Sequence, residues 1–237
     1  MKFNKLVFEE TFPVDGAPNS AFWTHDVGPK WANRELQWYT DSMDNCFIKD
    51  GVLTIRAQKG TGECPYSSSR ITTYGKKSWQ YGRFVISAKL PKGVGSWPAI
   101  WMLPNDIKTG VKWPRCGEID MMEHVGRDPN VVHFSLHTET YNHRKDNHRT
   151  YFQRIDGVLD EFHEYEMVWD EQQIAFLVDG IMMVTFKKQS TDMEGEWPFD
   201  KPFYLILNLA VGGFWGGPVV DADLPFIMQI CSIKVFQ

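Results

Sequence analysis

Three carboxylic acids lie close together in the segment Gly117-Glu-Ile-Asp-Met-Met-Glu-His124. Apolar residues separate them, which favours a β-strand, and in a regular strand Glu118 and Asp120 point to the same face. Glu123 is five residues beyond Glu118 and would point to the opposite face. One extra residue, accommodated as a β-bulge at the two methionines before Glu123, returns it to the face of the other two acids. The sequence therefore predicts three acids on one face of a bulged strand.

Such a group of acids could cleave a glycosidic bond. Neighbouring carboxylates repel one another, and this repulsion separates their pKa values. Retaining glycoside hydrolysis needs a carboxylate nucleophile and a protonated carboxylic acid about 5–5.5 Å apart. The Cα atoms of Glu118 and Glu123 would start about 13 Å apart along the strand, but their long side chains can converge over Asp120. A solvated acidic strand face is the alternative that these residues leave open.

The elements that position these acids are predicted to be strands. Short β-rich runs separated by turn residues recur along the chain, and one of them is apolar enough to be a central strand buried on both faces. Helical spacing is scarce, so we expect at most one or two helical turns, near Asp192 to Glu196. Two packed antiparallel sheets satisfy this all-β pattern, and without a linker they form one domain over residues 1–237. The expected strands include Val52 to Arg56, Gly82 to Leu90, Ile174 to Val178, Tyr165 to Asp170 and, as the central strand, Phe203 to Ala210.

The composition indicates a soluble globular protein with an uncharged partner. The 25 basic and 30 acidic residues give a net charge of −5, which offers no electrostatic footprint for nucleic acid or an anionic membrane. Aromatic residues make up 14% of the chain and include 10 Trp, more than an ordinary core of this size needs. Flat aromatic faces stack on sugar rings, so the excess favours a carbohydrate ligand. We expect a monomer that binds neither nucleic acid nor membrane.

The cysteines show no pattern of metal ligands or disulfides. The four of them, Cys46, Cys64, Cys116 and Cys231, form no C-x-x-C pair and are expected to be mostly free, buried thiols. No apolar run reaches the roughly 18 residues of a membrane span, and Met1 to Phe12 lacks the apolar stretch of a secretory signal. We therefore expect either a cytoplasmic protein or a secreted protein whose signal is absent from this sequence.

The run Glu118-Ile-Asp-Met-Met-Glu123 resembles the E-x-D-x-x-E signature of glycoside hydrolase family 16, in the bulged form of its laminarinase-type members. This resemblance implies a β-jelly-roll sandwich of two antiparallel sheets, whose concave face forms an open glycan cleft. It also implies a retaining endo-β-1,3-glucanase that acts on β-glucan polysaccharides or oligosaccharides. Further segments resemble bacterial members in the same order along the chain, namely Asn33-Arg-Glu-Leu-Gln37, Ser96-Trp-Pro-Ala-Ile-Trp-Met-Leu103, Phe162-His-Glu-Tyr165, Val178-Asp-Gly180 and Leu207-Asn-Leu-Ala-Val-Gly-Gly213.

The resemblance assigns roles to the three acids. Glu118 resembles the nucleophile, Glu123 the general acid/base, and Asp120 the residue between them that tunes their charge. Asp120 can hydrogen-bond Glu118 and orient it, while the charge of Glu118 raises the pKa of Glu123 and keeps it protonated. Four other residues resemble those that hold sugars on the non-reducing side of the cut, namely Asn33, Arg70, Trp97 and Trp101. Because the two tryptophans are four apart in an extended segment, they are expected to face the same side and could form a stacking platform or be buried in the core.

Two further segments carry residues with a possible role in the cleft. His133 and His137 are four apart, but Val131 to Thr138 is predicted to be a strand, so a helical zinc pair is not expected. His137 falls where the family places a cleft histidine, while packing or loop hydrogen bonding is expected for His133. Trp215 resembles the cleft-edge loop, where it touches substrate or caps the sandwich. The basic stretch from Asn142 to Arg149 is expected to be a solvated loop.

One departure from the family concerns metal binding. Many members hold a structural calcium with backbone oxygens near the amino terminus and a carboxylate in the last strand, and here the matching position is Cys231. A neutral thiol is a poor ligand for a hard cation that prefers oxygen. We therefore expect no structural calcium and no required cofactor. Asp221 or Asp223 could replace the missing ligand only if the loop before the strand folds back.

Several activities fit the sequence besides hydrolysis of β-1,3-glucan. Mixed-linkage β-1,3-1,4-glucan is a second substrate for the same kind of cleft, and agarose-type or galactan-type polymers are further candidates. A carbohydrate-binding jelly roll without catalysis is an alternative of another class, but a lectin gains nothing from clustered, repelling carboxylates. Transglycosylation, with a sugar in place of water as the acceptor, uses the same residues as hydrolysis.

Overall fold

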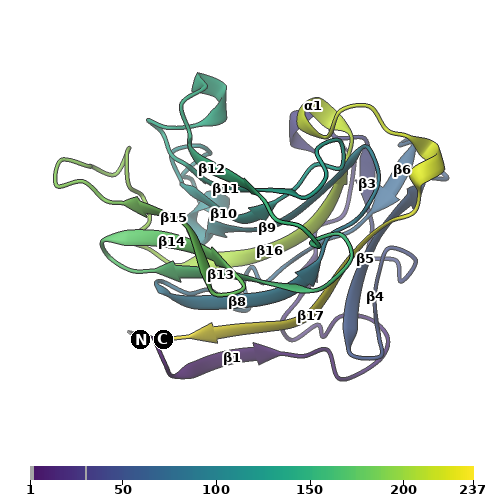
Figure 1. Cartoon of the computed structure of the whole chain (residues 1–237), viewed down its shortest axis with the longest axis horizontal. Coiled ribbons are helices and arrows are strands. Elements are labelled where there is room, and N and C mark those ends of the chain that lie inside the picture. The colour runs from purple at the N-terminus through teal and green to yellow at the C-terminus, as the bar shows by residue number, and fades with distance from the viewer. Residues whose placement is uncertain (1–2, 30) are drawn as a thin grey trace.

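The structure, a computed structural model, describes residues 3–29 and 31–237 and consists of two stacked, curved β-sheets (Figure 1). Neighbouring strands pair antiparallel, apart from the short parallel pair β3 and β6. The all-β sandwich predicted from the turn spacing is therefore confirmed. None of the helices in the described ranges has the length and apolar character of a membrane-crossing segment.

The seven-stranded sheet carries the predicted active-site segments. Its strands, in spatial order, are β12 (Arg149–Arg154), β11 (Val131–His137), β10 (Glu118–Glu123), β9 (Ser96–Pro104), β16 (Phe203–Val211), β7 (Arg70–Thr72) and β2 (Thr24–His25).

The ten-stranded sheet lies beneath it in Figure 1. Its main path is β15 (Ile181–Lys187), β14 (Gln173–Val178), β13 (His163–Trp169), β8 (Gly82–Lys89), β17 (Phe226–Phe236), β5 (Val52–Lys59), β6 (Tyr66–Ser68) and β3 (Gln37–Tyr39). Off this path, β1 (Leu6–Glu10) pairs with β17 and β4 (Cys46–Lys49) pairs with β5.

The two sheets share one hydrophobic core. Phe203 of the seven-stranded sheet meets Trp169 of the ten-stranded sheet edge to face, with ring centroids 5.4 Å apart. Phe134 and Phe176 likewise stack across the interface at 5.6 Å. Every residue of β16 is buried, which confirms the central strand expected from its apolar sequence. A core shared by both sheets favours the single domain predicted from the sequence.

Helices are few and short in the described part of the chain. The 3-10 helices are η1 (Ala32–Arg34), η2 (Asn105–Lys108), η3 (His143–Lys145) and η4 (Asp221–Asp223), and the α-helix is α1 (Gly213–Gly216). The segment from Asp192 to Glu196, where at most one or two helical turns were expected, forms turns held by main-chain bonds that Glu196 and Trp197 donate to Met193 O. The carboxylate of Asp192 accepts a 3.1 Å hydrogen bond from Arg149.

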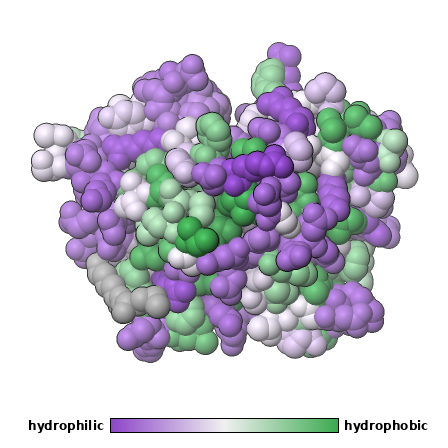
Figure 2. Space-filling model, in the orientation of Figure 1, coloured by the Kyte–Doolittle hydropathy of each residue, from purple (hydrophilic) through white to green (hydrophobic). Residues whose placement is uncertain are grey.

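The outer face of the seven-stranded sheet lies between raised edges. In Figure 1, α1 lies beyond one end of this sheet and β12 lies at the other edge. The space-filling view is indented along the same upper side of the molecule (Figure 2). The side chains of β10 that point away from the core belong to this outer face.

All four cysteines are free in the structure. Cys46 and Cys116 are buried, while Cys64 and Cys231 are partly buried. This agrees with the sequence, which offered no paired spacing.

Candidate active site

The predicted bulge lies in β10, between Asp120 and Glu123. Asp120 pairs with Trp101 of β9 and with Ser135 of β11, whereas Glu123 pairs with Ala99 and His133. Over this interval β10 advances by three residues and each partner strand advances by two, so one residue is surplus.

The surplus residue is accommodated on the core side. Both Met121 and Met122 are buried in the hydrophobic core. Flexible, unbranched methionine side chains fill irregular space well, which suits two consecutive residues that turn to the same side. Glu118, Asp120 and Glu123 consequently share the opposite face, as predicted.

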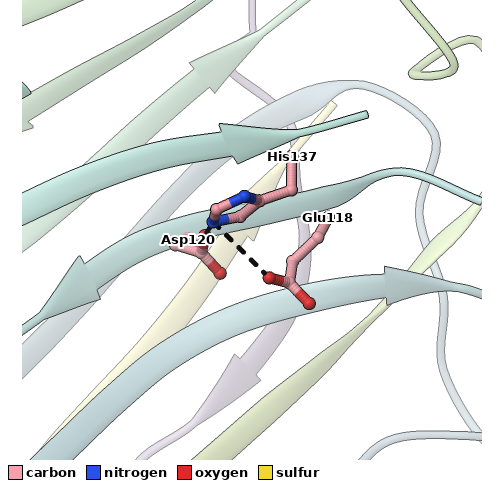
Figure 3. A group of neighbouring side chains, drawn as sticks. All are labelled: Glu118, Asp120 and His137. Atoms are coloured by element: carbon pink, nitrogen blue, oxygen red, sulfur yellow. Dashed lines mark ion pairs between the residues drawn. The ribbon is translucent and has the colours of Figure 1, made fainter. Parts of the chain in front are cut away.

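The histidine of the neighbouring strand contacts the first two acids. Nε2 of His137 lies 3.3 Å from Oδ2 of Asp120 and 3.8 Å from Oε1 of Glu118 (Figure 3). Glu118 and His137 are directly paired between β10 and β11, so the backbone register fixes this approach. When protonated, the imidazole offers a positive charge to both carboxylates.

Burial changes the acidity of all three carboxyl groups. It is the largest cause that raises the pKa of Glu118 well above its usual range, and the charge of Asp120 raises it further, while His137 lowers it. Burial and then the charge of Asp120 raise the pKa of Glu123 to about 8. Burial also raises the pKa of Asp120. Carboxyl groups coupled in this way do not all ionise at neutral pH, so the cluster keeps a proton available for acid catalysis.

These causes differ in one respect from the expectation drawn from the sequence. From the sequence, the charge of Glu118 is expected to raise the pKa of Glu123. In the structure, burial and the charge of Asp120 are the larger causes of the raised pKa. Sequence spacing indicates which face of a strand carries the acids, but it does not show how deeply the surrounding residues bury them.

Trp97 holds the general acid candidate. Its indole Nε1 donates a hydrogen bond of 3.1 Å to Oε1 of Glu123. The Trp97 ring is buried and meets Trp215 of α1 edge to face at 5.3 Å. Trp97 therefore orients a carboxyl group. Of the two expectations for its ring, an open stacking platform or burial, the structure shows burial.

Trp101 faces the same side of β9 as Trp97 and remains partly exposed. Its Nε1 donates a 2.6 Å hydrogen bond to Oδ1 of Asn208, and the guanidinium of Arg70 lies 4.8 Å from its ring centroid. Arg70 is in turn paired with Asp26 at 3.0 Å. These contacts fix the orientation of the Trp101 ring and the Arg70 guanidinium, two of the residues that the resemblance assigned to sugar binding.

Asn33 lies in η1 in a left-handed conformation, with φ of 59°. The glycine-rich segment of α1 packs against it: a Cβ atom on Gly213 would lie 2.8 Å from Asn33 O, and Gly213 has φ of 76°. Only glycine allows both this backbone conformation and this close approach. The loop that carries Trp215 is thereby fixed beside the Asn33 segment.

Sequence reasoning missed Glu35 as a residue of this site. Oε2 of Glu35 accepts a 2.8 Å hydrogen bond from Nε2 of Gln37, and burial raises the pKa of Glu35. Its negative charge also contributes to the raised pKa of Glu123. The sequence did offer a signal for Glu35: it lies two residues before Gln37, in the Asn33 to Gln37 segment that resembles the family.

The predicted strand at His133 is confirmed as β11, which removes the helical geometry that a zinc pair would need. His133 packs as expected, and its partners are aromatic: its ring lies 4.9 Å from that of Trp215 and 5.4 Å from that of Phe152. Burial lowers the pKa of His133 to about 4. The side chain is therefore a neutral aromatic group in the outer face of the sheet.

The segment Asn142 to Arg149 is largely solvated as expected, but two of its histidines return to the site. The ring of His148 stacks on His137 at 5.0 Å, and the ring of His143 meets His137 edge to face at 5.1 Å. Trp113 lies 6.0 Å from His137. The spacing along the chain could not predict this, because the loop must fold back across the end of β11.

The side chains at the position expected for a structural calcium do not fit such an ion. Sγ of Cys231 lies 3.1 Å from Oγ of Ser87, to which it is hydrogen-bonded. Asp221 is bound by Lys59 and by the hydroxyl of Tyr66, and Asp223 accepts a bond from the main-chain nitrogen of Val94. The three candidate ligands thus have other partners, and a thiol does not suit a hard cation. Absence of a structural calcium stays a prediction.

Comparison with known proteins adds an independent line of evidence. A family model described as Glycosyl hydrolases family 16 matches residues 33–223. A β-glucanase of Rhodothermus marinus is 45% identical over 243 residues, which cover 98% of this chain and 85% of that protein.

Solved structures are similar over nearly the whole chain. The laminarinase from Rhodothermus marinus superposes with a TM-score of 0.95 at 41% identity, covering 98% of this chain and 97% of that one. SCLam, described as a non-specific endo-β-1,3(4)-glucanase, superposes with a TM-score of 0.94 at 36% identity, covering 100% and 93% of the two chains.

Proposed function

The chain belongs to glycosyl hydrolase family 16, and from this premise we propose that it is a retaining endo-β-1,3-glucanase. The observation that carries the proposal is the bulge in β10, which places the buried Asp120 and the partly buried Glu118 and Glu123 on one face of the strand. The similarity to a β-glucanase and to a laminarinase supports β-glucan as the substrate class.

In the first step, the carboxylate of Glu118 attacks the anomeric carbon of the sugar on the non-reducing side of the scissile bond. Glu123 donates its proton to the glycosidic oxygen as the bond from that oxygen to the anomeric carbon breaks. The raised pKa of Glu123, about 8, keeps the proton on this group near neutral pH. His137 lies against Asp120 and Glu118, and it lowers the pKa of Glu118, which favours the carboxylate form of the nucleophile.

In the second step, Glu123 is a carboxylate and takes a proton from water as that water attacks the anomeric carbon. The bond to Glu118 breaks, and Glu118 leaves as a carboxylate. Two inversions at the same carbon restore the original configuration. A sugar hydroxyl that replaces the water would give transglycosylation by the same route.

We assign the non-reducing side of the cleft to the side of Arg70, Asn33 and Trp101. Arg70 and Asn33 offer donors to sugar hydroxyl groups. The partly exposed Trp101 ring, oriented by Asn208, offers an aromatic face. Trp97 acts on the chemistry by holding Glu123, while its Trp215 neighbour lies at the edge of the same face.

A mixed-linkage β-1,3-1,4-glucanase is the second candidate. The similarity to SCLam, described as a non-specific endo-β-1,3(4)-glucanase, favours this candidate. A binding protein without catalysis is not supported, because three clustered acids with raised pKa values destabilise a site that has no use for their protons.

The substrate is tested by incubating the purified protein with laminarin, lichenan, curdlan, agarose and carboxymethylcellulose and sizing the products. We expect short β-1,3-linked oligosaccharides from laminarin, and NMR should show the β-anomer before mutarotation. Faster cleavage of lichenan than of laminarin would support the mixed-linkage candidate. Formation of the α-anomer first would exclude Glu118 as nucleophile.

A further inference from the structure

A continuous row of paired residues crosses the outer face of the seven-stranded sheet. Glu123 pairs with Ala99 on one side and with His133 on the other. Beyond His133 the row ends at Phe152 of the edge strand β12. Directly paired residues on neighbouring strands point to the same face, so Phe152 and Glu123 share the face of the cleft.

The other direction of the row leads to the residues assigned to the non-reducing side. Ala99 pairs with Asn208, and Asn208 pairs with Arg70. Phe152 therefore lies on the opposite flank of the carboxylates from Arg70. In the reaction proposed above, that flank receives the leaving group.

Phe152 is the exposed end of an aromatic series. Its side chain is 63% exposed, and its ring lies 5.4 Å from that of His133 at an interplanar angle of 34°. His133 meets Trp215, which meets Trp97, the residue bound to Glu123. A single exposed phenylalanine is ordinary on a protein surface. Phe152 differs from such a residue in two ways: it ends the row of paired residues that starts at Glu123, and it ends the series of ring contacts that starts at Trp97. The exposed ring therefore extends the catalytic face in one direction.

The spacing of this row suits successive sugar rings. Neighbouring strands lie about 4.8 Å apart, so His133 is one strand and Phe152 two strands away from Glu123. A pyranose ring is similar in size to one such interval. The first leaving-group sugar thus reaches His133 and the second reaches Phe152. His133 is neutral, so it offers an uncharged ring and no competing ion pair.

We propose that Phe152, together with His133, forms a platform that binds the second sugar on the leaving-group side of the cut. This rests on the proposed function, and it assigns a specificity role to a residue of the edge strand. An exposed aromatic face there stacks on the apolar C–H face of a glucosyl unit. The platform acts on substrates that extend two sugars past the cut and on oligosaccharide acceptors.

The test compares two substrates that differ on the leaving-group side. Laminarihexaose can cover Phe152, whereas 4-nitrophenyl β-laminaribioside has one aryl group after the cut and ends near His133. For Phe152→Ala we expect kcat/KM on laminarihexaose to fall about tenfold through loss of the stacked contact. On the aryl substrate it should stay within about twofold, and Phe152→Trp should recover most of the activity on the hexasaccharide.

Phe162 provides a matched control, because it is an exposed phenylalanine, 39% accessible, at the end of the loop before β13 in the other sheet. Phe162→Ala should leave both substrates unchanged. With an active wild type, equal losses of Phe152→Ala on both substrates, or no loss on either, would overturn the platform alone. A wild-type protein that does not cleave laminarihexaose would overturn the proposed function and the platform with it.

Discussion

The indole N–H of Trp97 should lower the upper pH limit of the enzyme. Glu123 must be protonated to act as the general acid, so activity falls as the pH rises through its pKa of about 8. The 3.1 Å bond from Trp97 Nε1 to Glu123 Oε1 favours the ionised form and thereby lowers that pKa. Replacing Trp97 by Phe removes the donor and keeps an aromatic ring against Trp215.

The expected shift follows from the difference between two hydrogen bonds. A bond to a charged acceptor contributes about 1 kcal/mol more than a bond to a neutral one. Since one pKa unit corresponds to about 1.4 kcal/mol, the pKa of Glu123 should rise by about half to one unit in Trp97→Phe. The sign is upward, because the lost donor stabilised the carboxylate more than the acid.

The measurement is the pH profile of kcat/KM on laminarin between pH 5 and 10, which reports groups of the free enzyme. Trp101→Phe is the matched control, because the N–H of Trp101 is bound to Asn208 and not to a carboxyl group. The alkaline limb should move upward in Trp97→Phe and stay in place in Trp101→Phe. An unmoved or downward limb in Trp97→Phe, with the protein folded, would refute the role assigned to this bond.

Three further predictions concern the acids, the metal and the bulge. Glu118→Gln and Glu123→Gln should each lose most activity on laminarin without a lower melting temperature, because both remove one of several repelling acids; near-normal turnover in either would contradict the assignment. EDTA should leave the melting temperature almost unchanged, since Cys231 stands where a calcium ligand is expected, and a drop of many degrees would show a bound ion. Deleting Met122 should leave measurable activity, at a cost in stability, by giving regular alternation, whereas inserting Ala beside it should nearly abolish activity; the reverse order, in variants shown by circular dichroism to be folded, would argue against the bulge.

The face on which a residue lies could be predicted from the sequence where strand periodicity determines it. The spacing of Glu118, Asp120 and Glu123 predicted the bulge, and the spacing of Trp97 and Trp101 placed both rings on one side of β9. Each of these conclusions depends only on the alternation of side chains along a single strand.

What covers a residue could not be predicted in this way. Trp97 is buried because α1, more than a hundred residues further along the chain, places Trp215 against it. His148 reaches His137 only because a solvated loop folds back. Burial is the largest cause of the raised pKa of Glu123, and a local stretch of sequence does not show how deeply a side chain is buried.

The complete burial of β16 has a consequence for how the molecule opens. Amide protons exchange with solvent slowly where opening requires unfolding of the core, and quickly at rims and short helices. The amides of β16, including that of Asn208, should therefore be among the last to exchange with deuterium, whereas those of the four-residue α1 should exchange early. The strand β16, whose Asn208 orients Trp101, should then stay folded during local fluctuations in which α1 and its Trp215 unfold.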